Sequence, residues 1–215
     1  MAVRSAALAL VALLAGTAPG GARADAQADQ AALATVEKAI AALDSVRAEF
    51  VQELIDKDGK SVERAVGTLY LKRPGRFRWD YSEPKQLIVS DGETLWLYDP
   101  ELEQATVRKV KDTLSQTPAM LLAGQSKVAD GFTVSAAGSD GGLDWVRLVP
   151  KQNDTDFKEL RLGFAAGGLK RLEFDNKLNQ RTRVDLTRIE KNAKLADSLF
   201  HFTAPPGVDV IGPKS

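Results

Sequence analysis

The 215-residue chain contains no cysteine and only one histidine, His201. Without cysteine there can be no disulfide framework, no thiolate metal site and no cysteine-linked lipid anchor. One histidine cannot form a zinc-binding cluster, and no spacing singles out a Cys–His or Ser–His–Asp arrangement. His201 lies between Phe200 and Phe202, which favours a structural role near the C-terminus.

Other catalytic patterns are also lacking. The carboxylate pairs Glu101/Glu103 and Asp154/Asp156 lie in polar, loop-like stretches, where solvated turns are the more plausible interpretation. No glycine pattern carries the Lys and Ser/Thr of a phosphate-binding loop. We therefore expect a binding protein or carrier, not an enzyme, and no cofactor and no metal.

Long apolar runs are absent as well. No segment reaches the roughly 20 apolar residues of a membrane-spanning helix. Arg4 precedes a shorter apolar segment, and the Ala-Arg-Ala at 22–24 fits the small-x-small cleavage rule. We predict a cleaved signal peptide over 1–24, an uncleaved anchor being the alternative, and a single domain over 25–215. The exported chain is then expected in the periplasm of a Gram-negative cell.

There is no excess of charge of one sign. The sequence has 29 basic and 29 acidic residues, and removal of a leader containing Arg4 and Arg23 leaves 27 basic residues. Nucleic-acid binding is driven by counterion release and usually requires a basic excess. The charge balance therefore argues against a nucleic-acid partner.

One segment nevertheless combines basic and aromatic residues. "LYLKRPGRFRWDYSEP", residues 69–84, holds four of each. Such a mixture can bind single-stranded nucleic acid by stacking, or it can form a strand with two unlike faces. On a strand, Phe77, Trp79 and Tyr81 share one face and the arginines between them lie on the other.

Apolar periodicity predicts few helices. A stripe at spacings of three and four predicts a helix over 30–50; its members are Leu33, Val36, Ile40, Leu43, Val46 and Phe50. Residues 112–124 are typical of a second helix, with Pro118 near its start and Gly124 after it. A short helix is expected at 195–199.

Most of the remaining chain alternates as strands do. Strand patterns occur at 65–72, 76–81, 85–99, 103–110, 132–136, 144–150, 158–164, 169–176 and 180–190. Asp91-Gly92 marks a hairpin within 85–99. Turns roughly every ten residues indicate an antiparallel sheet or barrel whose helices cover one face. The pattern cannot distinguish a filled core from a hollow one.

The segment 69–84 and the following "LIVSDGETLWLYDPELEQATVRKVKD" (87–112) resemble the outer-membrane lipoprotein carrier family, LolA. The family's K-R-P turn, aromatic, Trp and Pro correspond to Lys72, Arg73, Pro74, Phe77, Trp79 and Pro84. Its S-D-G block corresponds to 90–100, and its closing F-x-F-x-P-P-x-G-V is similar to 200–208. The resemblance covers the chain after the leader, with little signal over 126–170.

The resemblance implies a mainly β fold: an unclosed antiparallel β-barrel, or half-barrel, with a helical lid over a hydrophobic cavity. It implies a periplasmic chaperone that accepts acylated lipoproteins from an inner-membrane ABC transporter. The cargo then passes to a LolB-like receptor at the outer membrane. Because the receptor is itself a lipoprotein, a chain without cysteine cannot be that receptor. The chain is expected to be a monomer. The alternative is a non-enzymatic periplasmic scaffold on the same half-barrel fold, with a filled core, that binds partners by its rim.

The implied site has two parts. An acyl-chain cavity is expected from the aromatic strands and the helix stripe; its residues are Leu33, Val36, Ile40, Leu43, Phe50, Phe77, Trp79, Trp96 and Met120. Arg73 is expected to bond the lid helices, at backbone carbonyls near 117–122, and to hold the empty cavity shut.

Overall fold

A computed structural model of the chain describes residues 20–110, 127–153, 155, 157–166 and 168–212. In these ranges twelve strands form one sheet, in the order β12-β6-β5-β4-β3-β2-β1-β11-β10-β9-β8-β7. The strands are β1 (Ser45–Ile55), β2 (Ser61–Lys72), β3 (Arg76–Glu83), β4 (Lys85–Asp91), β5 (Thr94–Asp99), β6 (Gln104–Lys109), β7 (Phe132–Asp140), β8 (Leu143–Pro150), β9 (Phe157–Ala165), β10 (Gly168–Asn176), β11 (Arg181–Lys191) and β12 (Asp209–Ile211).

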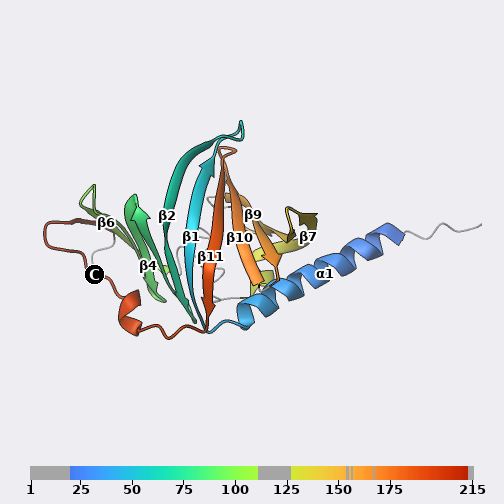
Figure 1. The fold of residues 1–215 in the computed structure, drawn as a ribbon, viewed down its shortest axis with the longest axis horizontal. Helices are drawn as coiled ribbons and strands as arrows, with labels where there is room; N and C mark the ends of the chain where they lie inside the picture. The colour runs from blue at the N-terminus through green and yellow to red at the C-terminus, as the bar shows by residue number, and fades with distance from the viewer. Residues whose placement is uncertain (1–19, 111–126, 154, 156, 167, 213–215) are drawn as a thin grey trace, which may run out of the picture.

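The sheet curves but does not close. Its two edge strands are β12 and β7, and every neighbouring pair is antiparallel except β12 and β6. Figure 1 shows the curved sheet with helix α1 (Gly20–Ala41) running along one side of it. The predicted half-barrel of antiparallel strands with a helix over one face is confirmed.

The boundary between helix and strand differs from the prediction. Helix α1 ends at Ala41, and Val46 and Phe50 belong to β1 instead of a helix over 30–50. Residues four apart share a face in a strand as well as in a helix, so the apolar stripe continued across the boundary unchanged. Ala48, between the two, is also fully buried, as a period of two requires.

The other predicted helices have different outcomes. The expected helix at 112–124 lies outside the described residues. The short helix expected at 195–199 is present as η2, a 3-10 helix over Asp197–Phe200. A four-residue helix, α3 (Val128–Gly131), and strand β12 were not expected.

One face of the sheet, here called the inner face, packs against α1 and carries the main core. Val36 of α1 is fully buried in the same apolar cluster as Phe50 and Phe77. The ring of Phe50 meets those of Trp79 and Tyr81 edge-on, with centroids 4.8 and 5.0 Å away. The aromatic face of β3 is therefore core, as expected from the alternation of 76–81.

The opposite, outer face carries the basic residues of segment 69–84. Lys72 Nζ and Arg76 Nη1 both donate to Asp197 Oδ1, over 2.6 and 2.7 Å. Arg78 Nη1 donates to the carbonyl oxygen of Leu199 over 3.4 Å. These three side chains attach the C-terminal segment to the sheet. Most of the basic residues of segment 69–84 therefore have a structural role.

Trp96 also lies on the outer face, which corrects its expected place in the cavity. Across the sheet, Leu95 pairs with Ser90, and Ser90 pairs with Phe77. Residues paired in this way share a face, so Leu95 is the inner residue of β5 and its neighbour Trp96 points outward. There its ring packs against Phe202, with centroids 5.4 Å apart.

Candidate functional site

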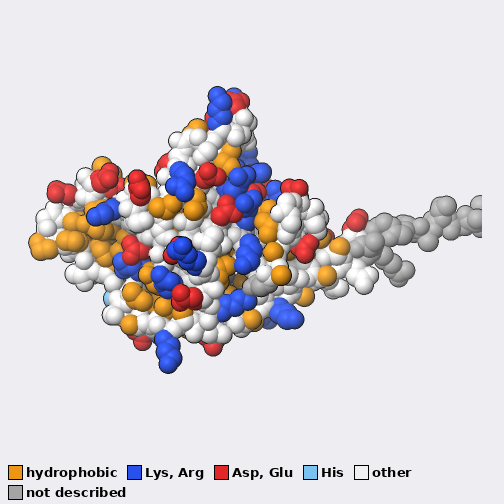
Figure 2. Space-filling view, viewed as in Figure 1, with side chains coloured by type: hydrophobic (Ala, Val, Ile, Leu, Met, Phe, Trp, Pro, Cys, Tyr) orange, Lys and Arg blue, Asp and Glu red, His pale blue; other side chains and the backbone are white. Residues whose placement is uncertain are grey.

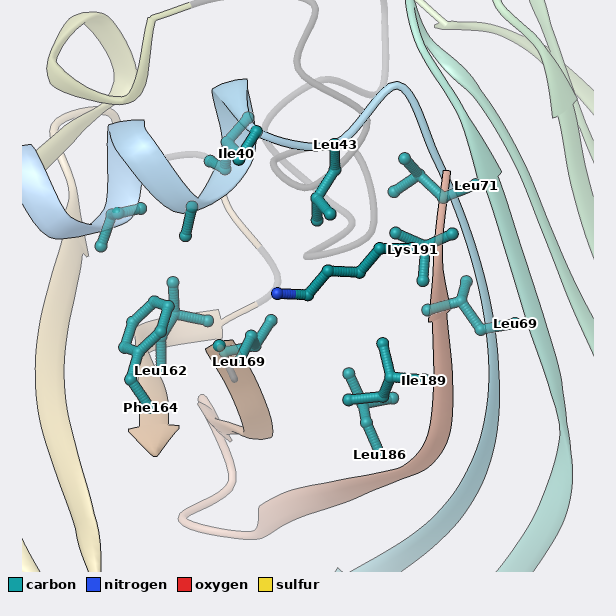
Figure 3. Close-up of a pocket in the computed structure, with 15 residues that line it drawn as sticks. Ile40, Leu43, Leu69, Leu71, Leu162, Phe164, Leu169, Leu186, Ile189 and Lys191 are labelled. Carbon is teal, nitrogen blue, oxygen red and sulfur yellow. The ribbon is translucent and has the colours of Figure 1, made fainter. Parts of the chain in front are cut away.

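An apolar cavity of about 110 Å³ lies between the C-terminal half of α1 and the inner face. Fourteen of its fifteen lining residues are apolar or glycine: Val36, Ala39, Ile40, Ala42, Leu43, Val46, Leu69, Leu71, Leu162, Phe164, Gly168, Leu169, Leu186 and Ile189; the fifteenth is Lys191. Figure 3 shows these side chains converging from the helix and from strands far apart in sequence.

Local patterns explain why these side chains converge. On α1, Val36 and Ile40 are four residues apart and therefore lie on one helical face. Leu162 and Phe164 of β9 are two residues apart, as are Leu69 and Leu71 of β2, so each pair projects from the same side of its strand. The lid helix and the curved sheet thus bring branched and aromatic side chains around one hollow.

Three of the predicted cavity residues line this hollow: Val36, Ile40 and Leu43. Leu33 lies one turn earlier on α1, in a more open groove with Phe132 and Val134 of β7. Met120 lies outside the described residues.

Phe50, Phe77 and Trp79 are placed beside the cavity, within the tightly packed core. Phe77 has no exposed surface and Trp79 is 7% exposed. Among the described residues, the indole Nε1 of Trp79 is the one buried side-chain nitrogen or oxygen that has no hydrogen-bond partner. An unsatisfied buried donor costs about 1–3 kcal/mol, so the inner core is not optimised for stability at this point.

Tyr81 ends the aromatic row of β3. Its hydroxyl donates to Gln52 Oε1 over 3.1 Å. Burial raises the pKa of Tyr81 to about 12. The phenol is therefore neutral at physiological pH, and the inner face carries no charge there.

Arg73 connects the sheet to the helix. It follows β2, and its Nη1 donates to the carbonyl oxygen of Ile40 over 2.9 Å. Its backbone N–H donates to the carbonyl of Asp44, also over 2.9 Å. Arg73 therefore holds the last turn of α1 and the segment after it; the carbonyls near 117–122 that were also expected as acceptors lie outside the described residues.

Sequence reasoning missed most of the strand residues that line the cavity. It identified the strand patterns at 158–164 and 180–190, but it placed the cavity at the aromatic β3 and β5. The signal was present in the matching faces of β9 and β11. What the pattern lacked was the curvature that turns those strands toward α1.

Other kinds of site find little support in the described part of the chain. It holds no group of three or more His, Cys, Asp or Glu side chains placed to bind a metal ion. The buried carboxylate of Glu173 is surrounded by Arg161, Arg181 and Arg183, at 3.4–3.6 Å. Such a paired carboxylate is structural.

The surface charge is mixed. Figure 2 shows basic and acidic side chains interspersed over the visible face, without a continuous basic stripe. None of the described helices is both long enough and apolar enough to cross a bilayer.

Comparison with known proteins relates the chain to one family. The family model described as "Outer membrane lipoprotein carrier protein LolA" matches residues 41–203. An outer-membrane lipoprotein carrier protein of Dechloromonas aromatica is 40% identical over 169 residues, 78% of this chain and 81% of the relative. One from Methylibium petroleiphilum is 40% identical over 195 residues, 90% of this chain and 93% of the relative.

Among solved structures, an uncharacterized conserved protein from Thermus thermophilus is similar in fold. Its TM-score is 0.52 at 14% identity, covering 85% of this chain and 97% of that one. This likeness concerns the fold alone.

Proposed function

Because the chain belongs to the LolA family of outer-membrane lipoprotein carrier proteins, we propose that it binds the acyl chains of lipoproteins beneath α1. It receives them after their release from the inner membrane and delivers them to the outer membrane. Its role is that of a transport chaperone, without catalytic chemistry.

The observation that carries this proposal is the composition of the cavity wall. Fourteen of fifteen lining residues present hydrocarbon or bare backbone, a surface that suits acyl chains and offers no charged pair or metal ligands for chemistry. The cavity also lies between two separable layers, a helix and a sheet. A pocket of this kind can enlarge when the helix moves.

The cavity must enlarge before it can hold an acyl chain. A cavity of about 150 Å³ accommodates a single benzene molecule, and this one measures about 110 Å³. A cavity of this volume is too small for an acyl chain. Cargo binding must displace α1 from the inner face, and the packed aromatics Phe50, Phe77 and Trp79 then become part of the enlarged wall.

The energetics fit a carrier that must also release. Burial of acyl chains contributes about 0.8 kcal/mol per methylene, so a chain of about fifteen methylenes is held by roughly 12 kcal/mol. An acyl chain thus requires an apolar host to cross an aqueous compartment. Closure of the empty cavity offsets part of that affinity, because the ligand must select the open state.

Arg73 is the residue proposed to set this balance. Its hydrogen bond to Ile40 exists only while α1 is seated, and hydrogen bonds from charged donors contribute about 1.5–3 kcal/mol each. The bond favours the closed state and so promotes release of the cargo.

The proposed partners follow from the family. Acylated lipoproteins are the cargo, an inner-membrane ABC transporter of the lipoprotein-release system is the donor, and a LolB-like receptor is the acceptor. The predicted signal peptide over 1–24 supports an exchange in the periplasm. The monomer remains the expected oligomeric state, and no nucleic acid is required.

A release assay tests the proposal. Spheroplasts that contain a radiolabelled outer-membrane lipoprotein are incubated with the purified chain lacking residues 1–24. We expect the lipoprotein to appear in the supernatant as a stable complex with the chain. If it stays in the spheroplast membrane, while an established carrier of the family releases it, the proposed function is wrong. A scaffold with a filled core would also fail to take up a fluorescent fatty-acid analogue after delipidation.

A further inference from the structure

Strand β11 contains a β-bulge where it passes the cavity. Arg47 of β1 pairs with Glu190, whereas Glu49, two residues later, pairs with Thr187, so β11 carries one extra residue there. Arg188 within this stretch has a φ of +46°. A bulge shifts the alternation of side chains and thereby re-aims those that follow it.

The shift decides which charged residue faces the hollow. Without it, the inward series that contains Leu186 would continue through Arg188 and Glu190. With it, Ile189 and Lys191 line the cavity. Arg188 and Glu190 turn outward and pair with β1, Arg188 with Glu49 over 2.7 Å and Glu190 with Arg47 over 3.0 Å.

The ammonium of Lys191 lies over the apolar wall of the cavity. Figure 3 shows its side chain extending from β11 toward Leu169, beneath Leu43. Its Nζ lies against the backbone of Gly168, 3.5 Å from the position that a Cβ would take there. This is an ordinary van der Waals distance, so the ammonium lies in contact range of Gly168, whose φ of +115° is what favours glycine there.

The backbone of Lys191 pairs with Val46 of β1, but no described residue forms a hydrogen bond or an ion pair with its ammonium. A lysine beside an apolar surface usually packs its stem there and turns its head to water. Here the residue as a whole is exposed, yet its head is directed over the cavity. One side of the ammonium therefore faces hydrocarbon, which solvates a charge poorly. Arg188 and Glu190, which precede it on β11, both form ion pairs with β1. Lys191 differs from them in this respect.

We propose that Lys191 is the head-group residue of the cavity: its ammonium binds the oxygen acceptor at the carbonyl end of an acyl chain whose tail fills the apolar hollow. This inference rests on the proposed function and deepens it. The cavity then recognises the polar end of its ligand as well as the length of the tail. An acyl chain therefore binds in one direction, with its carbonyl end at Lys191.

Two sources present this chemistry. In a lipidated cysteine the acceptor is an ester or amide carbonyl, and in a free fatty acid it is a carboxylate. The ammonium donates to either, and the bond with the carboxylate is the stronger because both partners are charged. Cationic amphiphiles with the same tail are disfavoured by like-charge repulsion.

Binding by the delipidated chain tests the inference. Calorimetric titration at low salt compares dodecanoate, methyl dodecanoate, dodecyltrimethylammonium and a synthetic tripalmitoyl-cysteine peptide. The variants are Lys191→Met, which keeps the length of the stem, and Lys191→Arg, which keeps the charge. Lys194→Met is the matched control, since Lys194 is an exposed lysine three residues later that does not line the cavity.

We expect the natural chain to bind dodecanoate about tenfold more tightly than dodecyltrimethylammonium, as a charge-assisted hydrogen bond at a half-open site allows. Lys191→Met should abolish this preference, Lys191→Arg should restore it, and Lys194→Met should keep it. An accompanying loss of lipopeptide affinity in Lys191→Met identifies the ester or amide carbonyl as the acceptor, and a loss confined to dodecanoate identifies the free carboxylate.

The inference is overturned if Lys191→Met binds all four compounds as the natural chain does, or if the natural chain shows no preference for the anion. Either result leaves the proposed function intact. If the natural chain binds none of the compounds, the proposed function fails, and the inference fails with it.

Discussion

The guanidinium of Arg73 and the carbonyl oxygen of Ile40 are joined by a hydrogen bond of 2.9 Å. Ile40 is the penultimate residue of α1, and its side chain lines the cavity. The carbonyl belongs to the last turn of the helix, where acceptors lack intrahelical partners. The bond thus secures the end of the lid that lies directly over the hollow.

Arg73→Leu removes this closing interaction and adds apolar surface near the cargo. We expect the variant to accept lipoprotein from the inner membrane but to hand it to the receptor at least tenfold more slowly, because a loss of about 1.5–3 kcal/mol shifts the open–closed equilibrium by that much or more. A transfer assay with purified receptor measures it. Release at the natural rate, or loss of uptake in place of release, would contradict the lock.

Ile40→Glu places a carboxylate in the wall of the cavity. Ile40 is only partly buried, so the chain should still fold, but a carboxylate desolvated against acyl tails is costly. Uptake of a fluorescent fatty-acid analogue should fall more than tenfold. Ala34→Glu, on the exposed side of the same helix, is the control and should bind normally. Equal binding by both variants would show that acyl chains do not lie beneath α1.

The raised pKa of Tyr81 should make the fold less stable in alkaline solution. Its pKa is raised to about 12 in the folded state by burial, against about 10 in an unfolded chain. Unfolding therefore releases a proton between these two values, so the stabilisation is complete below pH 10 and is lost as pH rises toward 12. The difference amounts to about 3 kcal/mol.

Urea unfolding at several pH values measures this effect. Tyr81→Phe should be less stable than the natural chain at pH 8, since it loses the bond to Gln52, but it should lose less stability between pH 10 and 11.5. Parallel pH profiles for the two proteins would show that Tyr81 ionises normally and that the inner face is open to water.

Protonation of Asp197 in acid should weaken the attachment of the C-terminal segment to the sheet. Hydrogen bonding and attraction from Lys72, and then attraction from Arg76, hold the pKa of Asp197 below its ordinary value of 3.8. The stabilisation is present above that value and fades as pH falls through the lower folded pKa. Asp197→Asn should increase amide hydrogen exchange at η2 at neutral pH and leave α1 unchanged. Unchanged exchange at η2 would mean that the hydrogen bond from Arg78 and the apolar contacts of Phe200 are sufficient to hold the segment.

Local patterns were sufficient to predict most of the sheet. Alternation located β2 to β11, and Asp91-Gly92 marked the hairpin between β4 and β5, where Gly92 has a φ of +102°. The end of α1 was mispredicted because a spacing of four satisfies both helix and strand. The family assignment, made from the residues around Arg73 and Trp79, is confirmed by the comparisons.

The site was harder to predict, because it depends on the curvature of the sheet and on register. Trp96 and Leu95 alternate, and only the pairing with Ser90 decides which of them faces inward. In β11 the extra residue at the bulge exchanges Glu190 for Lys191 at the cavity. The trace of this shift in the sequence is the spacing of three between Leu186 and Ile189, which the period of two of a regular strand does not predict.

The central claim is that acyl chains bind between α1 and the inner face, and site-resolved photocrosslinking tests it most directly. A lipoprotein that carries a diazirine-labelled acyl chain is loaded onto the chain and irradiated, and the modified peptides are identified by mass spectrometry. The account predicts adducts on residues 39–43 of α1 and its following loop and on 162–169 and 186–189 of the sheet. Adducts confined to the outer face around Trp96 and Phe202 would contradict it.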